Sequence, residues 1–256
     1  MRYLATLSSI CLALPLLAGP FEADVVVLGE VHDNPHHHAR QAEIITEVQP
    51  KAIVFEMLTE AQAAAHLPGA DADALNAAFG WADSGWPDFA MYFPIFEAAP
   101  SARVYGGGIP RPAARAAMQT GLAEAFGAEA QTYGLLAALP KTQQTEREAL
   151  QKAAHCDALP EDLLPAMVDI QRLRDAALAR AAAQAFAETG GPVAVITGNG
   201  HARLDWGMPV YLQRAQPELR IIAIGQGEDG RPPAGQFSSV EDAPSIARPD
   251  PCAAFQ

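Results

Sequence analysis

Five short runs of apolar, mostly β-branched residues constrain the fold of this chain more than any other feature. They read VVVL, AIVF, ARVYG, VAVIT and RIIAIG, and they begin at Val25, Ala52, Ala102, Val193 and Arg220. Each run is continuous, which is typical of strands covered on both faces. One helical stretch, begun by Asn34 and Pro35, separates the first two runs and completes a βαβ unit. We therefore predict an α/β fold with a mainly parallel sheet flanked by helices.

The connections between the later runs are too long for simple loops. Residues 59–99 and 112–190 are rich in Ala, Leu, Glu and Gln, and helical periodicity is clear over 163–188. Long structureless loops are uncommon in compact domains, so we expect helical insertions that build a subdomain. The predicted α/β domain covers residues 24–225. The Gly-, Pro- and Ser-rich residues 226–256 are expected to form an extended C-terminal tail.

The first nineteen residues are expected to be a signal peptide. A basic residue precedes an apolar run with the length of a secretory core, and the alternative is a retained anchor. Cys11 lies inside this run, so it does not form a lipidation site. The expected location is the periplasm or the cell envelope. There, Cys156 and Cys252 are expected to form a disulfide between the tail and the helical region, the alternative being two free thiols.

Composition and short motifs exclude several classes of function. The chain has 17 Lys and Arg against 30 Asp and Glu, a formal charge of −13, which argues against nucleic acid or an anionic membrane as partner. No GxSxG is present to supply a serine nucleophile, and the glycine run YGGGIP lacks the Lys-Ser/Thr of a phosphate-binding loop. No CxxCH is present, which excludes covalent c-type haem attachment.

Polar side chains follow four of the predicted strands at the points where the strands end. Because the carboxyl ends of parallel strands meet at one edge of the sheet, we expect these side chains to share a crevice. Taken singly, each is also consistent with a solvated loop or a helix cap. Together they predict a functional cleft, and they are Glu30, His32 and Asp33, then Glu56, then Arg111, and finally His201.

The histidine tract after Pro35 is less informative than its density suggests. Consecutive residues on a helix point about 100° apart, so His36, His37 and His38 cannot all serve one site. At most one of them joins His32, and the candidates are His37 and His38.

Carboxylates and imidazoles from separate strands are the ligands of a catalytic metal site with an open position. The candidate ligands are Glu30, His32, His37, Glu56 and His201. Without a thiolate, such a set suits Mn²⁺, Fe²⁺, Co²⁺ or Zn²⁺ and does not choose among them. On chemistry alone, these residues favour a metal-dependent hydrolase.

Six ordered blocks of sequence resemble one known family, the haem-binding uptake proteins of the ChaN type. This family lies within the wider Tiki, TraB and erythromycin-esterase-like superfamily. The blocks span most of the predicted mature chain, and they are LGEVHDNPHHHARQ, FEML, GWADSGWPDFAMYFPIFEAA, GGIPRPAAR, HCDALPEDLLPAMVDIQRLRDAALA and VITGNGHARLDWGMPVYL. The resemblance implies a parallel-sheet domain that shares a cleft with a helical subdomain.

The resemblance also implies a ligand, because the ChaN branch is associated with haem, often in iron acquisition, with tyrosine as an iron ligand. Tyr92 lies in an aromatic block and is the candidate ligand, followed by His201 and His32; Arg111 and Arg115 are candidates for the propionates. We expect a non-enzymatic haem-binding protein of the bacterial envelope that takes up or handles haem or iron, with a homodimer and a transport component as further partners. The alternative is a metal-dependent peptidase or esterase, whose catalytic residues by superfamily resemblance are Glu30, His32, Glu56 and His201.

Overall fold

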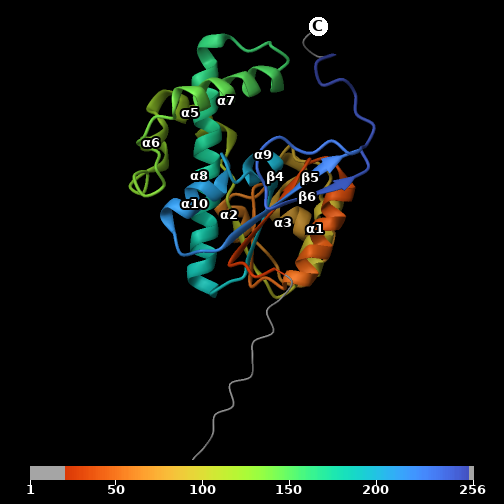
Figure 1. Cartoon of the computed structure of the whole chain (residues 1–256). Coiled ribbons are helices and arrows are strands. Elements are labelled where there is room, and N and C mark those ends of the chain that lie inside the picture. The colour runs from red at the N-terminus through yellow and green to blue at the C-terminus, as the bar shows by residue number, and fades with distance from the viewer. Residues whose placement is uncertain (1–20, 254–256) are drawn as a thin grey trace, which may run out of the picture.

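Parallel strands form the centre of the computed structural model, which describes residues 21–253 (Figure 1). Within these residues the strands build one six-stranded sheet in the order β3-β2-β4-β1-β5-β6. They are β1 (Val25–Glu30), β2 (Ala52–Phe55), β3 (Arg103–Gly106), β4 (Val193–Gly198), β5 (Ile221–Glu228) and β6 (Ser239–Ala243). The predicted α/β class and the parallel sheet are confirmed.

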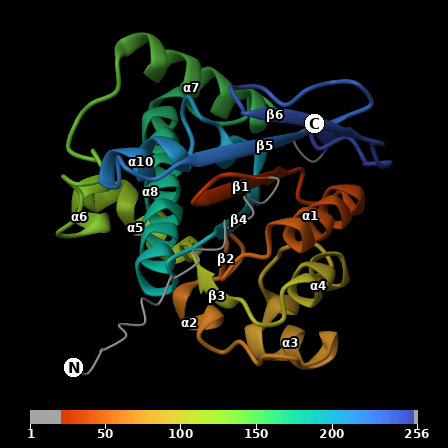
Figure 2. The same ribbon diagram turned by 60° about the horizontal axis from the view of Figure 1, so that its bottom comes forward.

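The apolar runs form strands because both faces of the sheet are covered. Every residue of β1 and β4 is buried. Val25 and Val27 belong to a core shared with α8 (Leu164–Thr189) and α10 (Met208–Ala215). Val26 and Leu28 point to a second core with α1 (Pro35–Val48), α3 (Ala72–Phe79) and α4 (Phe89–Ala98). Figure 2 shows these two groups of helices on opposite sides of the sheet. Each fully buried side chain of this size contributes about 1.5–3 kcal/mol.

The two long connections are helical, as the sequence indicates. The first contains α2 (Glu60–Ala63), α3, a 3₁₀ turn η1 (Trp81–Asp83) and α4. The second contains α5 (Arg111–Thr120), α6 (Leu122–Phe126), α7 (Lys141–Ala154), η2 (Glu161–Leu163) and α8. A four-residue helix, α9 (Asn199–Ala202), follows β4 directly. Among residues 21–253, no helix is long and apolar enough to cross a membrane.

The C-terminal segment contains a strand that the sequence did not suggest. β6 carries the sequence SVEDA and pairs with β5 at the edge of the sheet, where four of its residues stay polar or small and none is fully buried. An exposed edge strand needs no apolar run, so the pattern used for the other strands missed it. The segment beyond β6 is held by the disulfide between Cys156 and Cys252, which confirms the predicted bond. The predicted signal peptide lies outside the described residues.

Candidate functional site

The strand register brings three carboxyl ends together at one edge of the sheet. Glu30 of β1 lies beside Gly198 of β4, and Phe55 of β2 lies beside Ile196 of β4. Glu56 therefore reaches the end of β4, where its Oε2 atom accepts hydrogen bonds from Thr197 Oγ1 at 2.6 Å and from the Gly198 amide at 2.8 Å. The predicted meeting of Glu30 and Glu56 at this edge follows from the parallel arrangement.

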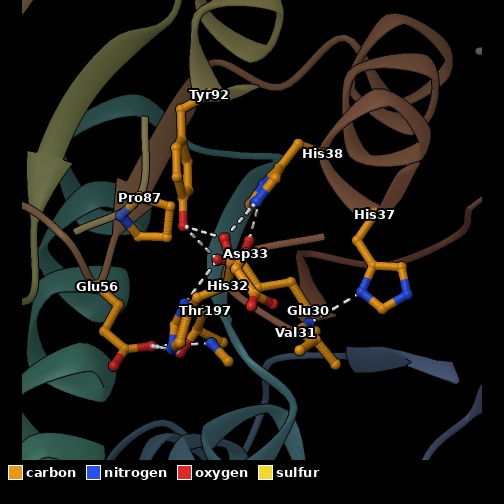
Figure 3. Close-up of polar contacts among 12 residues, drawn as sticks. Glu30, Val31, His32, Asp33, His37, His38, Glu56, Pro87, Tyr92 and Thr197 are labelled. Carbon is orange, nitrogen blue, oxygen red and sulfur yellow. Dashed lines mark hydrogen bonds and ion pairs between the residues drawn. The ribbon is translucent and has the colours of Figure 1, made fainter. Parts of the chain in front are cut away.

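The buried carboxylate of Glu30 is the centre of a hydrogen-bond network (Figure 3). Its Oε1 atom accepts from His32 Nδ1 at 2.8 Å and from the Tyr92 hydroxyl at 2.8 Å. Its Oε2 atom accepts from Gln41 Nε2 at 2.8 Å and lies 3.4 Å from His38 Nδ1. Burial alone would raise the pKa of Glu30, but hydrogen bonds from the two histidines outweigh it and hold the pKa well below its usual range. Glu30 is therefore an anion at neutral pH.

His32 is the member of this network that faces outward. Its side chain is 33% exposed, and its ring packs against Trp86 with 4.9 Å between the ring centres. The Nδ1–H group donates to Glu30, which leaves Nε2 directed toward Glu56, 4.0 Å from Oε2. Burial would lower the pKa of His32, but the hydrogen bond to Glu30 and the charge of Glu56 raise it to about 9.

His201 approaches Glu56 from the other side and has its own carboxylate. His201 Nδ1 lies 2.6 Å from Asp175 Oδ1, and Nε2 lies 3.6 Å from Glu56 Oε1. Burial would lower the pKa of His201, but the charges of Glu56 and Asp175 raise it. Two imidazoles thus point their Nε2 atoms at one carboxylate while buried carboxylates hold their Nδ1 atoms, an arrangement that fixes the orientation of both rings.

The remaining histidines of the tract do not share this position. Val31 N–H donates to His37 Nδ1 at 2.9 Å, and His37 Nε2 donates to the Gly227 carbonyl at 3.1 Å. Both ring nitrogens of His37 are therefore used by backbone groups, and the structure places this predicted ligand outside the site. His36 is exposed. His38, the other candidate, is the residue that reaches Glu30.

Tyr92 and the two predicted propionate ligands occupy very different environments. Tyr92 is completely buried, and its hydroxyl donates to Glu30. Burial and the nearby charge of Glu30 raise the pKa of Tyr92 far above its usual value, so the hydroxyl keeps its proton. Arg111 lines a cavity beside Glu56, whereas Arg115 is exposed one turn further along α5 and does not line it.

The cavity beside Glu56 has a volume of about 420 Å³. One aromatic side chain, Trp86, and several apolar ones form part of its wall, together with the glycine run after β3 and two arginines. Its lining includes Glu56, Met57, Trp86, Arg111, Arg174 and Leu178. A small number of charged groups in a partly apolar wall is typical of sites for small organic ligands.

Three residues of the site lie on helices and were not predicted from the sequence. Asp175 and Arg174 lie on α8, and Gln41 lies on α1. The sequence carries a partial signal for Asp175, because this acidic residue has apolar residues, Leu178 and Ala179, three and four positions further along a predicted helix. For Gln41 and Arg174 the sequence offered no comparable signal.

The predicted ligands of a metal ion are not gathered into a metal-binding cluster in the described part of the chain. Among residues 21–253, no group of three or more His, Cys, Asp or Glu side chains is arranged to hold one. The facing atoms of His32, Glu56 and His201 are instead spaced as ion pairs, at 3.6 and 4.0 Å.

Comparison with known proteins gives one family and one similar fold. Residues 18–212 match the family described as haem-binding uptake, Tiki superfamily, ChaN. Among solved structures, ChaN of Campylobacter jejuni, whose structure describes cofacial haem binding, shares 19% identity at a TM-score of 0.61, over 80% of this chain and 82% of that one. A succinoglycan biosynthesis protein (11% identity) and a Bacillus cereus protein (13%) each give a TM-score of 0.38, over 80% of this chain and 66% of theirs. No curated protein sequence matches the chain significantly.

Proposed function

This chain belongs to the ChaN family of haem-binding uptake proteins in the Tiki superfamily, and from that premise we propose that it binds haem in the cavity beside Glu56. The observation that carries this proposal is the position of His32, a partly exposed imidazole whose ring packs against Trp86 and whose Nε2 faces Glu56, two residues that line the cavity. The haem would supply the iron, and the chain would supply a ligand, an apolar wall and cations.

The donor set fits that ligand. His32 offers an imidazole behind two lining residues, Trp86 and Glu56, and Met57 and Leu178 add apolar surface to the cavity wall. The hydrogen bond from His32 Nδ1 to Glu30 orients the ring and increases its basicity, as carboxylates do behind metal-bound histidines. We therefore favour His32 as the iron ligand.

Tyr92 has a different role in this proposal. To reach an iron atom, its hydroxyl would have to leave the hydrogen bond with Glu30 and leave a fully buried position. Tyr92 instead donates a hydrogen bond to Glu30, and Glu30 accepts one from His32 Nδ1 and so orients the imidazole ring. Tyr92 thus acts as a positioning residue, and ligation by Tyr92 is the competing outcome of the test.

A haemin titration of the purified mature chain tests the proposal. We expect a saturable Soret band of imidazole character, at least tenfold weaker binding (about 1.4 kcal/mol) in His32→Ala, and a band of unchanged position in Tyr92→Phe. His36→Ala is the matched control, because His36 is a nearby exposed histidine.

Two results would contradict the assignment in different ways. A band of tyrosinate character that survives in His32→Ala and disappears in Tyr92→Phe would assign the iron to Tyr92. The absence of any saturable band would refute haem binding itself.

One observation supports a second candidate function, a metal-dependent hydrolase. His32 and His201 each have a carboxylate on Nδ1, and both direct Nε2 toward Glu56. Such a set could hold a divalent cation after small side-chain shifts. Metal analysis, followed by esterase and peptidase assays with added Mn²⁺ or Co²⁺, tests this. Turnover that is lost in a folded His201→Ala variant would favour the hydrolase.

We further propose that the chain works in the bacterial periplasm or envelope, in the uptake or handling of haem or iron. The disulfide between Cys156 and Cys252 supports an oxidising compartment, because such bonds are rare in the cytosol. A homodimer and a transport component remain the expected partners. Fractionation of the native host tests the location, and a growth assay of a deletion strain on haem as sole iron source tests the role.

A further inference from the structure

A second cavity lies between α7, α8 and the segment after β4, and it shares no lining residue with the cavity beside Glu56. Its volume is about 130 Å³, which is enough for several water molecules or one small organic group. The lining of this α7–α8 cavity includes Arg147, Leu150, Gln151, Asp175, His201 and Trp206. The cavity therefore adjoins the imidazole whose Nε2 faces Glu56.

Arg147 brings a buried cation into the wall of the α7–α8 cavity. The residue is 8% exposed, and no carboxylate among residues 21–253 forms an ion pair with it. Its Nη2 donates to the Trp206 carbonyl oxygen at 3.2 Å, and its Nε has no partner in this part of the chain. Arg203, which lies over the same indole ring, is paired with Asp205 at 2.6 Å. Because a buried guanidinium without acceptors is costly, Arg147 indicates a ligand that accepts hydrogen bonds.

Two acceptor oxygens in the same wall lack a donor. The Asp175 side chain is 4% exposed, and its Oδ1 lies 2.6 Å from His201 Nδ1, whereas no described residue donates a hydrogen bond to its Oδ2. Gln151 lies one turn after Arg147 on α7, and its buried Oε1 atom has no partner within the described residues. Buried polar atoms are normally satisfied. The cavity wall therefore calls for a ligand that donates hydrogen bonds as well as accepting them.

The charges of the wall restrict the class of ligand further. An anion that contacts Arg147 in so small a cavity also lies beside the free oxygen of Asp175, which repels it. A cation that contacts Asp175 is repelled by Arg147 in the same way. The pattern that remains is a neutral group with one acceptor and two donors, and a primary carboxamide has this pattern on one planar unit.

We propose that the α7–α8 cavity is a second binding site, and that its ligand is a small primary carboxamide. The carbonyl oxygen of the ligand accepts from the Arg147 guanidinium, and its two N–H groups donate to Asp175 Oδ2 and Gln151 Oε1 after small rotations of these side chains. Leu150, which is 44% exposed, and Trp206 provide apolar surface for a short alkyl chain. This site is independent of the cavity proposed for haem.

An NMR titration of the haem-free mature chain tests this site, with the Trp206 indole N–H and the His201 ring protons as reporters. The probes are propionamide, propionate and propionamidinium, which share one shape and differ in charge and hydrogen-bonding groups. We expect saturable shifts with propionamide, and binding at least about tenfold weaker for the anion and the cation. N-methylpropionamide has one donor fewer than propionamide and should also bind about tenfold more weakly.

Three variants separate the contributions of the wall. Gln151→Leu removes one acceptor at similar side-chain size and should weaken propionamide binding about tenfold. Asp175→Asn removes the charge that repels an anion, so propionate should bind this variant at least as tightly as propionamide does. Gln144→Leu is the matched control on α7, because the Gln144 side chain bonds Glu148 and does not line the cavity. It should leave the affinity for propionamide unchanged.

The absence of a saturable shift with propionamide would show that the α7–α8 cavity holds water only, and would overturn the proposal. Equal affinities of the three probes for the wild-type chain would also overturn it, as would propionamide binding that is unchanged in Gln151→Leu. A preference for the amide over propionate that persists in Asp175→Asn would refute the argument from charge. None of these results depends on haem, which is absent from the titration.

Discussion

Haem affinity should rise steeply with pH if His32 is the iron ligand. Iron binds only the unprotonated Nε2 atom, and Glu30 and Glu56 raise the pKa of His32 to about 9. At pH 7 only about 1% of the imidazole is then free to bind, and the apparent affinity is reduced by that fraction. We expect an increase of about tenfold for each pH unit from 7 to 9, and about 100-fold in all by pH 10.

The assay is a Soret titration at pH 7, 8, 9 and 10, paired with an NMR titration of the histidines in the haem-free protein. His32→Ala provides the baseline, because haemin itself titrates in this range. An affinity that does not change with pH in the wild-type chain, or one that changes equally in His32→Ala, would refute the reasoning.

The Glu56→Gln variant tests the same pKa effect separately. The substitution removes the charge that faces Nε2 of His32 and leaves the hydrogen bond from His32 Nδ1 to Glu30 in place. A carboxylate about 4 Å away raises a histidine pKa by about one unit or more. The variant should therefore bind haem about tenfold more tightly than wild type at pH 7, with little difference at pH 10. Weaker binding at both pH values would show that Glu56 contributes to the site in another way.

Three further predictions concern the fold itself. Replacing Cys156 and Cys252 by Ser removes a crosslink across 96 residues and should lower the free energy of unfolding by about 3–4 kcal/mol. In urea titrations, the wild-type chain with its disulfide reduced should lose the same amount of stability as the double variant. Gly106→Ala should lower the free energy of unfolding by about 2–3 kcal/mol, because the added methyl would overlap the carbonyl oxygen of Thr59, the N-cap of α2. Gly200→Ala is the control, because a methyl there meets nothing within 4 Å and should leave the stability unchanged. The folded-state pKa of His32 is raised from 6.5 to about 9, so the stability that the protonated imidazole adds is complete below pH 6.5 and is lost as the pH rises to about 9. The free energy of unfolding should therefore be lower at pH 9 than at pH 6, and this difference should be smaller in His32→Gln than in the wild-type chain.

The elements that could be predicted from the sequence are the fully buried strands. Continuous apolar runs such as Val25–Leu28 indicate strands because both faces of the sheet are covered, and the last residue of each run marks the carboxyl end of its strand. Once the strands are parallel, Glu30 and Glu56 must meet at one edge. The family resemblance, which rests on these same blocks, is confirmed over residues 18–212. β6 escaped prediction because an edge strand of polar residues carries no such signal.

Residues contributed by helices were harder to find, for a physical reason. Whether Asp175 or Arg174 points into the cleft depends on how α8 is rotated against the sheet, and that rotation is set by packing along the whole helix. Periodicity predicts that α8 is a helix and does not give its angle. The same uncertainty explains why Arg115 was expected at the cavity: it is exposed on α5, whereas Arg174 of α8 lines the cavity.

The histidine tract shows how a dense motif can serve a single ligand. His37 binds the backbone at Val31 and Gly227, and so ties the loop after β1 to β5. His38 donates from Nε2 to the His32 carbonyl at 2.8 Å, and its Nδ1 faces Glu30. Both side chains therefore fix the short segment that carries His32. His37 contacts the backbone of this segment at Val31, and His38 contacts it at the His32 carbonyl and also approaches Glu30. If the tract were itself a binding site, replacing His38 by Gln would remove a ligand and change the Soret spectrum. In the arrangement described here, His38→Gln should leave the spectrum unchanged and destabilise the fold by about 1–3 kcal/mol, the cost of leaving a buried partner unsatisfied.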